Sequence, residues 1–230
     1  MKKLIVMHKH RNGGIPSRLL WLNWVVVIAV VCGGSSRQFV SAQIVSNLDE
    51  VANSADSVTS TLWRANRFTT GNNAGGYTLD SVIGRFSAQT TAGTFIAQIY
   101  SDNESRPNVS LESLTGAAPA TAGDHTFSSA GLSLDANTSY WIAWTATSGQ
   151  YTPENTFSNS ETSTDGWTIG GSSASGDAGG NWTAESGPGA RLFSIQATPV
   201  PEPHEYAMFV GLGLMVFVGA RRHLVSKALA

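Results

Sequence analysis

The sequence has little cysteine, little charge and, over most of its length, no lysine. Cys32 is the single cysteine, so a disulfide within the chain and a metal site made of several thiolates are both excluded. Charged residues make up 13% of the chain, against about 25% in typical domains. Between residues 43 and 200, five arginines stand against fourteen carboxylates. A segment this acidic would repel phosphate groups, and nucleic acid is therefore excluded as a partner.

The sequence also lacks an uninterrupted apolar run of about 20 residues, the length that crosses a bilayer as a helix. Two shorter runs are present. The first, residues 19–31, follows a basic stretch and has the length of a signal-peptide core. Small side chains at Ser41 and Ala42 predict that signal peptidase cleaves between Ala42 and Gln43. Residues 1–42 are then the signal peptide.

Two other readings of this end remain to be weighed. The long linker that starts at Gly33 leaves an uncleaved membrane anchor as an alternative. A lipoprotein signal is disfavoured, because Val31 precedes Cys32 where such signals have a small residue. Cleavage after Ala42 would leave a mature protein without cysteine, so its stability would come from its core alone.

The second apolar run, residues 206–220, predicts a short transmembrane helix. As a helix it would be about 22 Å long, less than a hydrocarbon layer of about 30 Å. Arg221 and Arg222 follow it directly and can reach the lipid head groups, which allows a short helix to span. The alternative, a buried helix of a soluble domain, does not explain an apolar surface on all sides beside two arginines.

Basic residues flank both apolar runs on their outer sides, at 2–18 and 221–227. The positive-inside rule keeps such flanks in the cytoplasm. It therefore predicts that the acidic middle lies across the membrane, with residues 224–230 as a cytoplasmic tail.

A short proline motif, Pro201-Glu202-Pro203, precedes the second apolar run. Proline lacks an N–H group and fixes φ, so these residues stay extended and offer one carboxylate near the membrane surface. The order of proline motif, apolar helix and paired arginines over residues 200–223 resembles a PEP-CTERM sorting signal. The resemblance implies a Gram-negative bacterium in which an exosortase, a membrane-embedded transpeptidase-like enzyme, recognises the motif.

The same resemblance implies the protein's fate. The chain would cross the inner membrane with the help of signal peptidase, be held by its C-terminal helix, and after processing reach the cell surface or the medium. Hosts with this system often make extracellular polysaccharide.

The middle of the chain, residues 43–199, predicts one all-β domain. Short runs of β-branched and aromatic residues recur between turn signals, without helical periodicity. Phe95, Ala97 and Ile99 alternate with more polar residues, which places them on one face of a strand. Such a pattern is typical of a β-sandwich, here jelly-roll-like. The expected strands are 43–47, 62–70, 78–87, 94–101, 125–128, 139–147, 166–169 and 191–197.

Several stretches of this middle, among them LWRANRFTTGNNAGGYTLDSVIGRF, LSLDANTSYWIAW and ARLFSIQA, are similar to the choice-of-anchor R family. The similarity covers residues 62–197. It implies a β-rich extracellular module that occurs with different surface anchors. The family carries no known catalytic residues, so the similarity bears on fold and location.

Enzymatic chemistry finds little support in the residues. His125, with Asp124 and Ser128 or Ser129, could be written as a hydrolase triad, but no Gly-x-Ser-x-Gly elbow presents a serine. We therefore expect a protein that is not an enzyme and has no cofactor.

The residues also raise two kinds of binding site, one for calcium and one for a sugar. Asp102, Asn103 and Glu104 place oxygen ligands for calcium in one loop, but the EF-hand pattern is absent and such turns are common for local reasons, so no metal site is expected. Among the tryptophans of the middle, Trp182 is expected to present an exposed ring on which a sugar could stack. The main prediction is a non-enzymatic exported surface or matrix protein. The alternative is a carbohydrate-binding or polysaccharide-associated protein.

Overall fold

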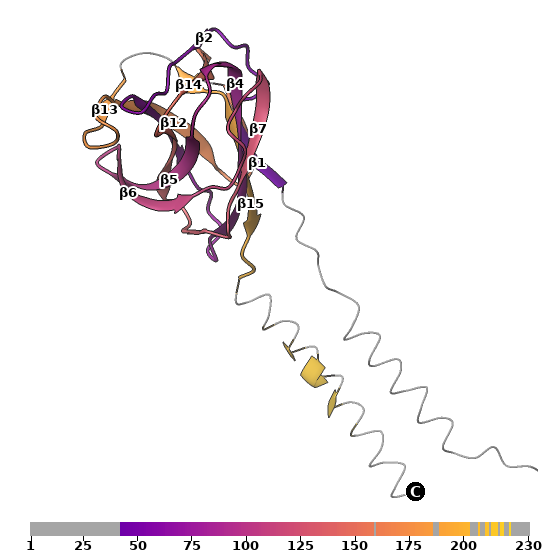
Figure 1. Ribbon diagram of the computed structural model, residues 1–230. Helices are drawn as coiled ribbons and strands as arrows, with labels where there is room; N and C mark the ends of the chain where they lie inside the picture. Colours follow the sequence, from indigo (N-terminus) through magenta and orange to yellow (C-terminus); the bar gives the residue numbers. More distant parts are fainter. Residues whose placement is uncertain are drawn as a thin grey trace, which may run out of the picture. The chain divides into compact units, whose positions relative to one another are not determined.

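The computed structural model describes residues 42–158, 160–185 and 189–202. It also describes Ala207, Val210, Gly211, residues 213–215, Phe217, Val218 and Arg221. The residues between 42 and 199 form two antiparallel sheets packed face to face, as in a β-sandwich (Figure 1). This confirms the predicted all-β architecture.

The first sheet is built around β4 (Tyr77–Thr91), whose fifteen residues let it pair with several shorter strands. Its main path has the order β11 (Thr162–Ser163), β1 (Ala42–Ser46), β15 (Phe193–Pro199), β4, β10 (Gln150–Thr156) and β14 (Ala190–Arg191). Three short strands join off this path, with β2 (Ser54–Ala55) on β10 and both β7 (Gly123–Ser128) and β8 (Ser133–Leu134) on β4.

Strand β9, the most buried strand of the sandwich, lies near the centre of the second sheet. Its order is β13 (Thr183–Ala184), β12 (Thr168–Ser175), β3 (Trp63–Thr69), β9 (Ser139–Ala146), β5 (Phe95–Asn103) and β6 (Arg106–Ser113).

The main core lies between the two sheets and is rich in aromatic rings. Phe86 of the first sheet meets Phe95 and Trp144 of the second edge-on, with ring centroids 5.3 and 5.4 Å apart. Ala97 and Ile99 are fully buried beside them, so the predicted inward face of residues 95–99 is confirmed. Edge-on aromatic pairs add to the stabilisation that comes from the area they bury.

A second cluster lies on the opposite face of the second sheet, and we call it the outer-face cluster. Its buried members are Ala65, Tyr100, Trp141, Ala143 and Trp182. Strand β9 is therefore buried on both faces. The reason is that residues 176–182 fold back over this side of the sheet, and they bring Trp182 with them.

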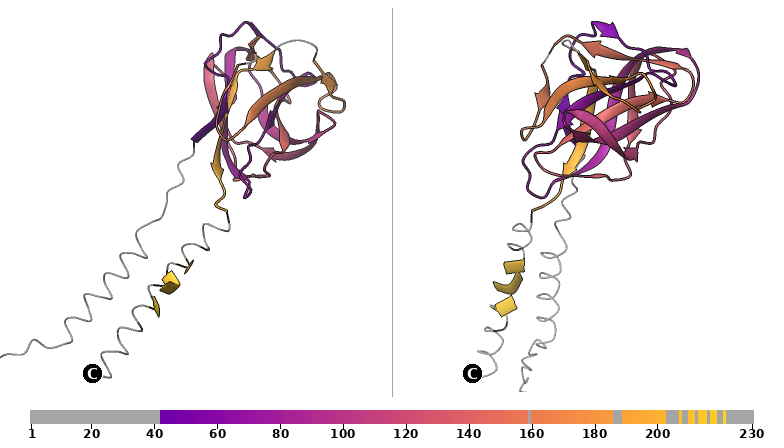
Figure 2. Two further views of the ribbon diagram at one scale, coloured as in Figure 1. Left: turned by 180° about the vertical axis from the view of Figure 1, so that it is seen from behind. Right: turned by 90° about the vertical axis from the view of Figure 1, so that its left-hand side faces the viewer.

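The chain enters and leaves the sandwich side by side. Strands β1 and β15 pair antiparallel, with Ala42 opposite Ala197 and Gln43 opposite Gln196. Figure 2 shows the indigo β1 and the orange β15 next to each other at one end of the sandwich. The predicted cleavage site after Ala42 and the residues that lead into the proline motif therefore lie at the same end.

The predicted flanking segments fall largely outside the described residues. Residues 1–41 and 222–230 are outside them, as is Pro203. Within the predicted transmembrane segment, the residues that are described, from Ala207 to Val218, are helical. Among the described residues, no helix is long and apolar enough to cross a membrane.

Candidate functional site

Val200 separates the proline motif from the end of β15, and the loop that precedes β4 holds the first part of the motif. We call residues 71–76 the Gly71–Gly76 loop. The Val200 N–H donates to the Gly76 carbonyl at 3.0 Å. The Asn73 side-chain amide donates to the carbonyls of Val200 at 2.9 Å and of Gly76 at 2.6 Å. These bonds extend the order of the sheet past Pro199.

Glu202, the acidic residue of the motif, also contacts this loop. Its Oε1 accepts a hydrogen bond of 3.3 Å from the Ala74 N–H. Pro201 lies between the two points of attachment, while Pro203 is outside the described residues. The structure thus places the first two motif residues against the folded body.

Two glycines allow the loop to approach the segment so closely. Gly76 has φ of +74°, a conformation that favours glycine. A Cβ at Gly75 would lie 2.5 Å from the Val200 carbonyl oxygen, so a side chain there would push the segment away. The loop is anchored at Asn73, whose N–H donates to the Tyr77 hydroxyl at 3.2 Å. The glycines and asparagines of residues 71–76 are typical of a turn, but they do not indicate which segment the turn contacts.

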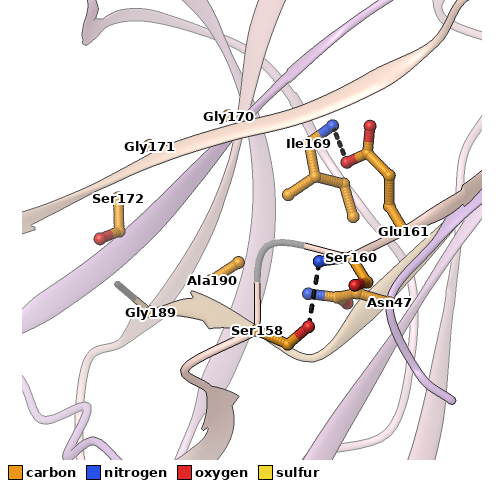
Figure 3. Close-up of a pocket in the computed structure, with 10 residues that line it drawn as sticks. All are labelled: Asn47, Ser158, Ser160, Glu161, Ile169, Gly170, Gly171, Ser172, Gly189 and Ala190. Atoms are coloured by element: carbon orange, nitrogen blue, oxygen red, sulfur yellow. Dashed lines mark hydrogen bonds between the residues drawn. The ribbon is translucent and has the colours of Figure 1, made fainter. Parts of the chain in front are cut away.

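A polar pocket of about 310 Å³ lies elsewhere on the body, between residues of both sheets (Figure 3). Glu161 lines it and accepts a hydrogen bond of 2.6 Å from the Ile169 N–H. Burial raises the pKa of Glu161, and this hydrogen bond opposes the rise. The pocket is lined by Asn47, Ser158, Ser160, Glu161, Ile169, Gly170, Gly171, Ser172, Gly189 and Ala190.

The chemistry of this pocket is modest. Asn47 is already engaged, because its amide donates to the Arg191 carbonyl and accepts from the Phe193 N–H, at 3.0 and 2.7 Å. Among the described residues of the lining, the remaining polar side chains are serines and Glu161, and none of these residues is aromatic. A small polar molecule would find hydroxyl groups here but no surface on which to stack.

A buried arginine that the sequence pattern did not single out lies next to this pocket. The side chain of Arg191 is 1% exposed and forms ion pairs with Asp56 at 2.8 Å and with Glu185 at 2.6 Å. It also donates to the carbonyl of Ala65 in the second sheet. The cluster therefore joins the two sheets, which is a structural role. A lone cation within the apolar stretch of β14 and β15 was the signal that could have found it.

The prediction that Trp182 presents an exposed ring is wrong. The residue is 7% exposed, and its ring meets that of Tyr100 edge-on with centroids 6.1 Å apart. Gly179 of the same loop lies against Trp63, since a Cβ there would be 2.6 Å from its ring. The loop thus covers the aromatic side chains on this face, and a sugar cannot stack on Trp182.

The acidic and histidine side chains named above for a hydrolase triad and for a calcium loop make other contacts. The Asp124 carboxylate pairs with Arg85 at 2.6 and 3.0 Å, while the His125 Nε2 lies 2.8 Å from the Thr121 carbonyl. Asp102 accepts from the Trp141 indole N–H at 2.6 Å. In the described part of the chain, no three His, Cys, Asp or Glu side chains are grouped to hold a metal ion.

The remaining residues that were predicted as sites lie at the start of β1 and at the end of the predicted transmembrane segment. Ala42 and Gln43 are the first residues of β1. Arg221 is helical and exposed, and Arg222 is outside the described residues. The structure therefore places Ala42, the residue before the predicted cleavage site, at the same end of the sandwich as the start of the proline motif.

No protein-family model, curated protein or solved structure matches the chain.

Proposed function

We propose that this chain is a non-enzymatic surface or extracellular matrix protein, exported across the inner membrane of a Gram-negative bacterium. Signal peptidase removes residues 1–42, and a transmembrane helix at 206–220 holds the protein until an exosortase acts at Pro201-Glu202-Pro203. The mature sandwich then remains at the surface or is released.

The observation that carries this proposal is the order of the features at the C-terminal end. A proline motif, an apolar run and two arginines follow one another shortly after the last strand of a folded domain. A membrane enzyme needs a recognisable extended segment close to the bilayer, and a stop that keeps it there. This order supplies both.

The pairing of β1 with β15 supports the proposal from the geometry. A chain with membrane-directed segments at both ends must bring these ends to one side of its folded domain, so that the domain can sit on one side of the bilayer. Ala42 and Ala197 are directly paired, which meets this requirement.

The alternative, polysaccharide binding by the sandwich, has less support. In the described part of the body the tryptophan side chains are buried or half-buried, so none offers the open ring that sugar stacking needs. The described residues that line the polar pocket beside Glu161 include no aromatic side chain. We therefore propose a structural role for the body.

Replacement of Pro201, Glu202 and Pro203 with alanine in the native host tests the proposal. Fractionation and immunoblotting should show the variant retained in the membrane at its unprocessed size, because the exosortase no longer recognises it. Glu205→Ala removes a nearby carboxylate outside the motif and should be processed normally. Mature-sized triple variant at the surface or in the medium would refute recognition through the motif.

A further inference from the structure

The contacts between the Gly71–Gly76 loop and residues 200–202 point to a second role for the body. We infer that this loop gates the sorting motif, and that Asn73 is the residue that positions it. The inference rests on the proposed function, since a gate has meaning only if an enzyme acts on the motif.

The loop occupies backbone and side-chain groups of the segment that an enzyme would need. Enzymes that bind an extended peptide commonly pair with its backbone, as an added strand does. In this chain the Val200 N–H and carbonyl are both taken, by Gly76 and Asn73. The Glu202 carboxylate, the one charge of the motif, is bonded to the Ala74 N–H.

The loop and the segment are in close contact at Gly75. The Gly75 position leaves no room for a Cβ beside the Val200 carbonyl, and the next residue, Pro201, has its carbonyl oxygen 3.5 Å from that position. While the loop occupies this position, an enzyme has no room to contact the same side of the segment. The loop and the enzyme therefore compete for the same segment.

The contact between the loop and the segment is weak enough to open. The contact consists of a few hydrogen bonds, each of which shifts an equilibrium by about fivefold when it is lost. The segment therefore opens repeatedly while the sandwich stays folded, as local segments of proteins do. When opening is fast relative to cleavage, the rate of cleavage follows the population of the open form.

Asn73 determines this population because one side-chain amide holds both the Val200 and the Gly76 carbonyls. Its neighbour Asn72 provides a matched control, since it has the same chemistry and an exposed side chain. Gly75→Ala provides a second, independent variant, which pushes the segment off while Asn73 is kept.

The test combines two measurements on the full chain. In detergent micelles, NMR should show that the Val200 amide exchanges about fivefold faster in Asn73→Ala than in the wild type, with Asn72→Ala unchanged. In the native host, pulse–chase labelling should show faster conversion of Asn73→Ala and Gly75→Ala to the processed form, by up to the same factor.

The outcomes separate the gate from the proposed function. Unchanged Val200 exchange in Asn73→Ala and Gly75→Ala would show that the loop does not hold the segment. Faster exchange with unchanged or slower processing would overturn the gate, while the proposed function stands if the triple alanine variant still blocks processing. If the triple variant is processed like the wild type, the proposed function fails, and the gate with it.

Discussion

Arg191 is almost fully buried, and its guanidinium group joins elements that are far apart in the sequence. It pairs with Asp56 and Glu185, and Glu185 also pairs with Arg64 of β3. The planar guanidinium group suits this role because it can bond several acceptors at fixed angles. The ion pairs fix the position of β14 against the second sheet.

We predict that Arg191→Ala lowers the free energy of unfolding by about 3 kcal/mol, because the partly buried Asp56 loses its ion-pair partner and Glu185 keeps only Arg64. Thermal or urea unfolding of the full chain in mild detergent, followed by near-UV circular dichroism, measures this. Arg106→Ala removes an exposed arginine of the edge strand β6 and should cost less than about 0.5 kcal/mol. Equal costs for the two variants would contradict the structural role of Arg191.

Residue-scale properties were also the hardest to predict from the sequence. The pattern at Phe95, Ala97 and Ile99 shows which side chains face the core, because strand periodicity is local. The burial of Trp182 and Arg191 depends on which distant segments fold over them. Nothing in the residues around Trp182 indicates that its loop returns to Tyr100. The Trp182 ring was therefore predicted to be exposed.

At the scale of elements, the loop 176–182 is held by a network around Asp177. Its carboxylate accepts from the Asn181 side chain at 2.6 Å, from the Asn181 N–H at 2.8 Å and from the Ser175 hydroxyl at 2.7 Å. The hydrogen bonds from Asn181, and next the one from Ser175, lower the pKa of Asp177 to about 2. This network keeps Gly179 of the loop against Trp63 and Trp182 of the loop against Tyr100.

The pH dependence follows from the direction of this shift. Because the folded-state pKa lies below the ordinary value of 3.8, the carboxylate stabilises the loop above about pH 4. This contribution disappears as the pH falls toward 2. The NMR signal of the Trp182 indole N–H should therefore move between pH 4 and pH 2.

Asp177→Asn should remove this dependence and shift the Trp182 signal at every pH, since the charged acceptor is gone. Asp165→Asn, an exposed aspartate outside the loop, should behave like the wild type. A Trp182 signal that stays constant to pH 2 in the wild type would contradict the role of Asp177.

Most of the long strands were predictable and two were not. The strands expected at 62–70, 94–101 and 139–147 correspond to β3, β5 and β9, because they are rich in aromatic and β-branched residues. Strands β6 and β10 were missed, since both are polar and contain a proline, Pro107 or Pro153. Proline is tolerated in β6 because β6 lies at the edge of its sheet.

Strand β12 shows why small residues are hard to assign. The sequence predicts a strand that ends at Ile169, followed by a turn-rich stretch from Ser172. In the structure β12 continues through Gly170 and Gly171 to Ser175. Its pairing with β3 and β13 decides this, and neither partner is visible in the local pattern.

At the scale of the whole molecule, the sandwich places its first strand, β1, beside its last strand, β15. The proposed signal cleavage site lies in β1 and the proline motif follows β15, the neighbour of β1 in the sheet, while the Gly71–Gly76 loop holds the start of the motif against the body. The sequence predicted both membrane-directed ends separately. Their closeness could not be predicted, because it depends on the pairing of the first and last long strands.

The central claim is that the protein is exported and trimmed at both ends. Mass spectrometry of the intact protein from the native host, recovered from the cell surface and the medium, tests it most directly. We predict a mature chain that begins at Gln43 and ends at or near Pro201-Glu202-Pro203, without Arg221 and Arg222. A chain recovered from the cytosol, with both Met1 and Ala230 still present, would contradict the account.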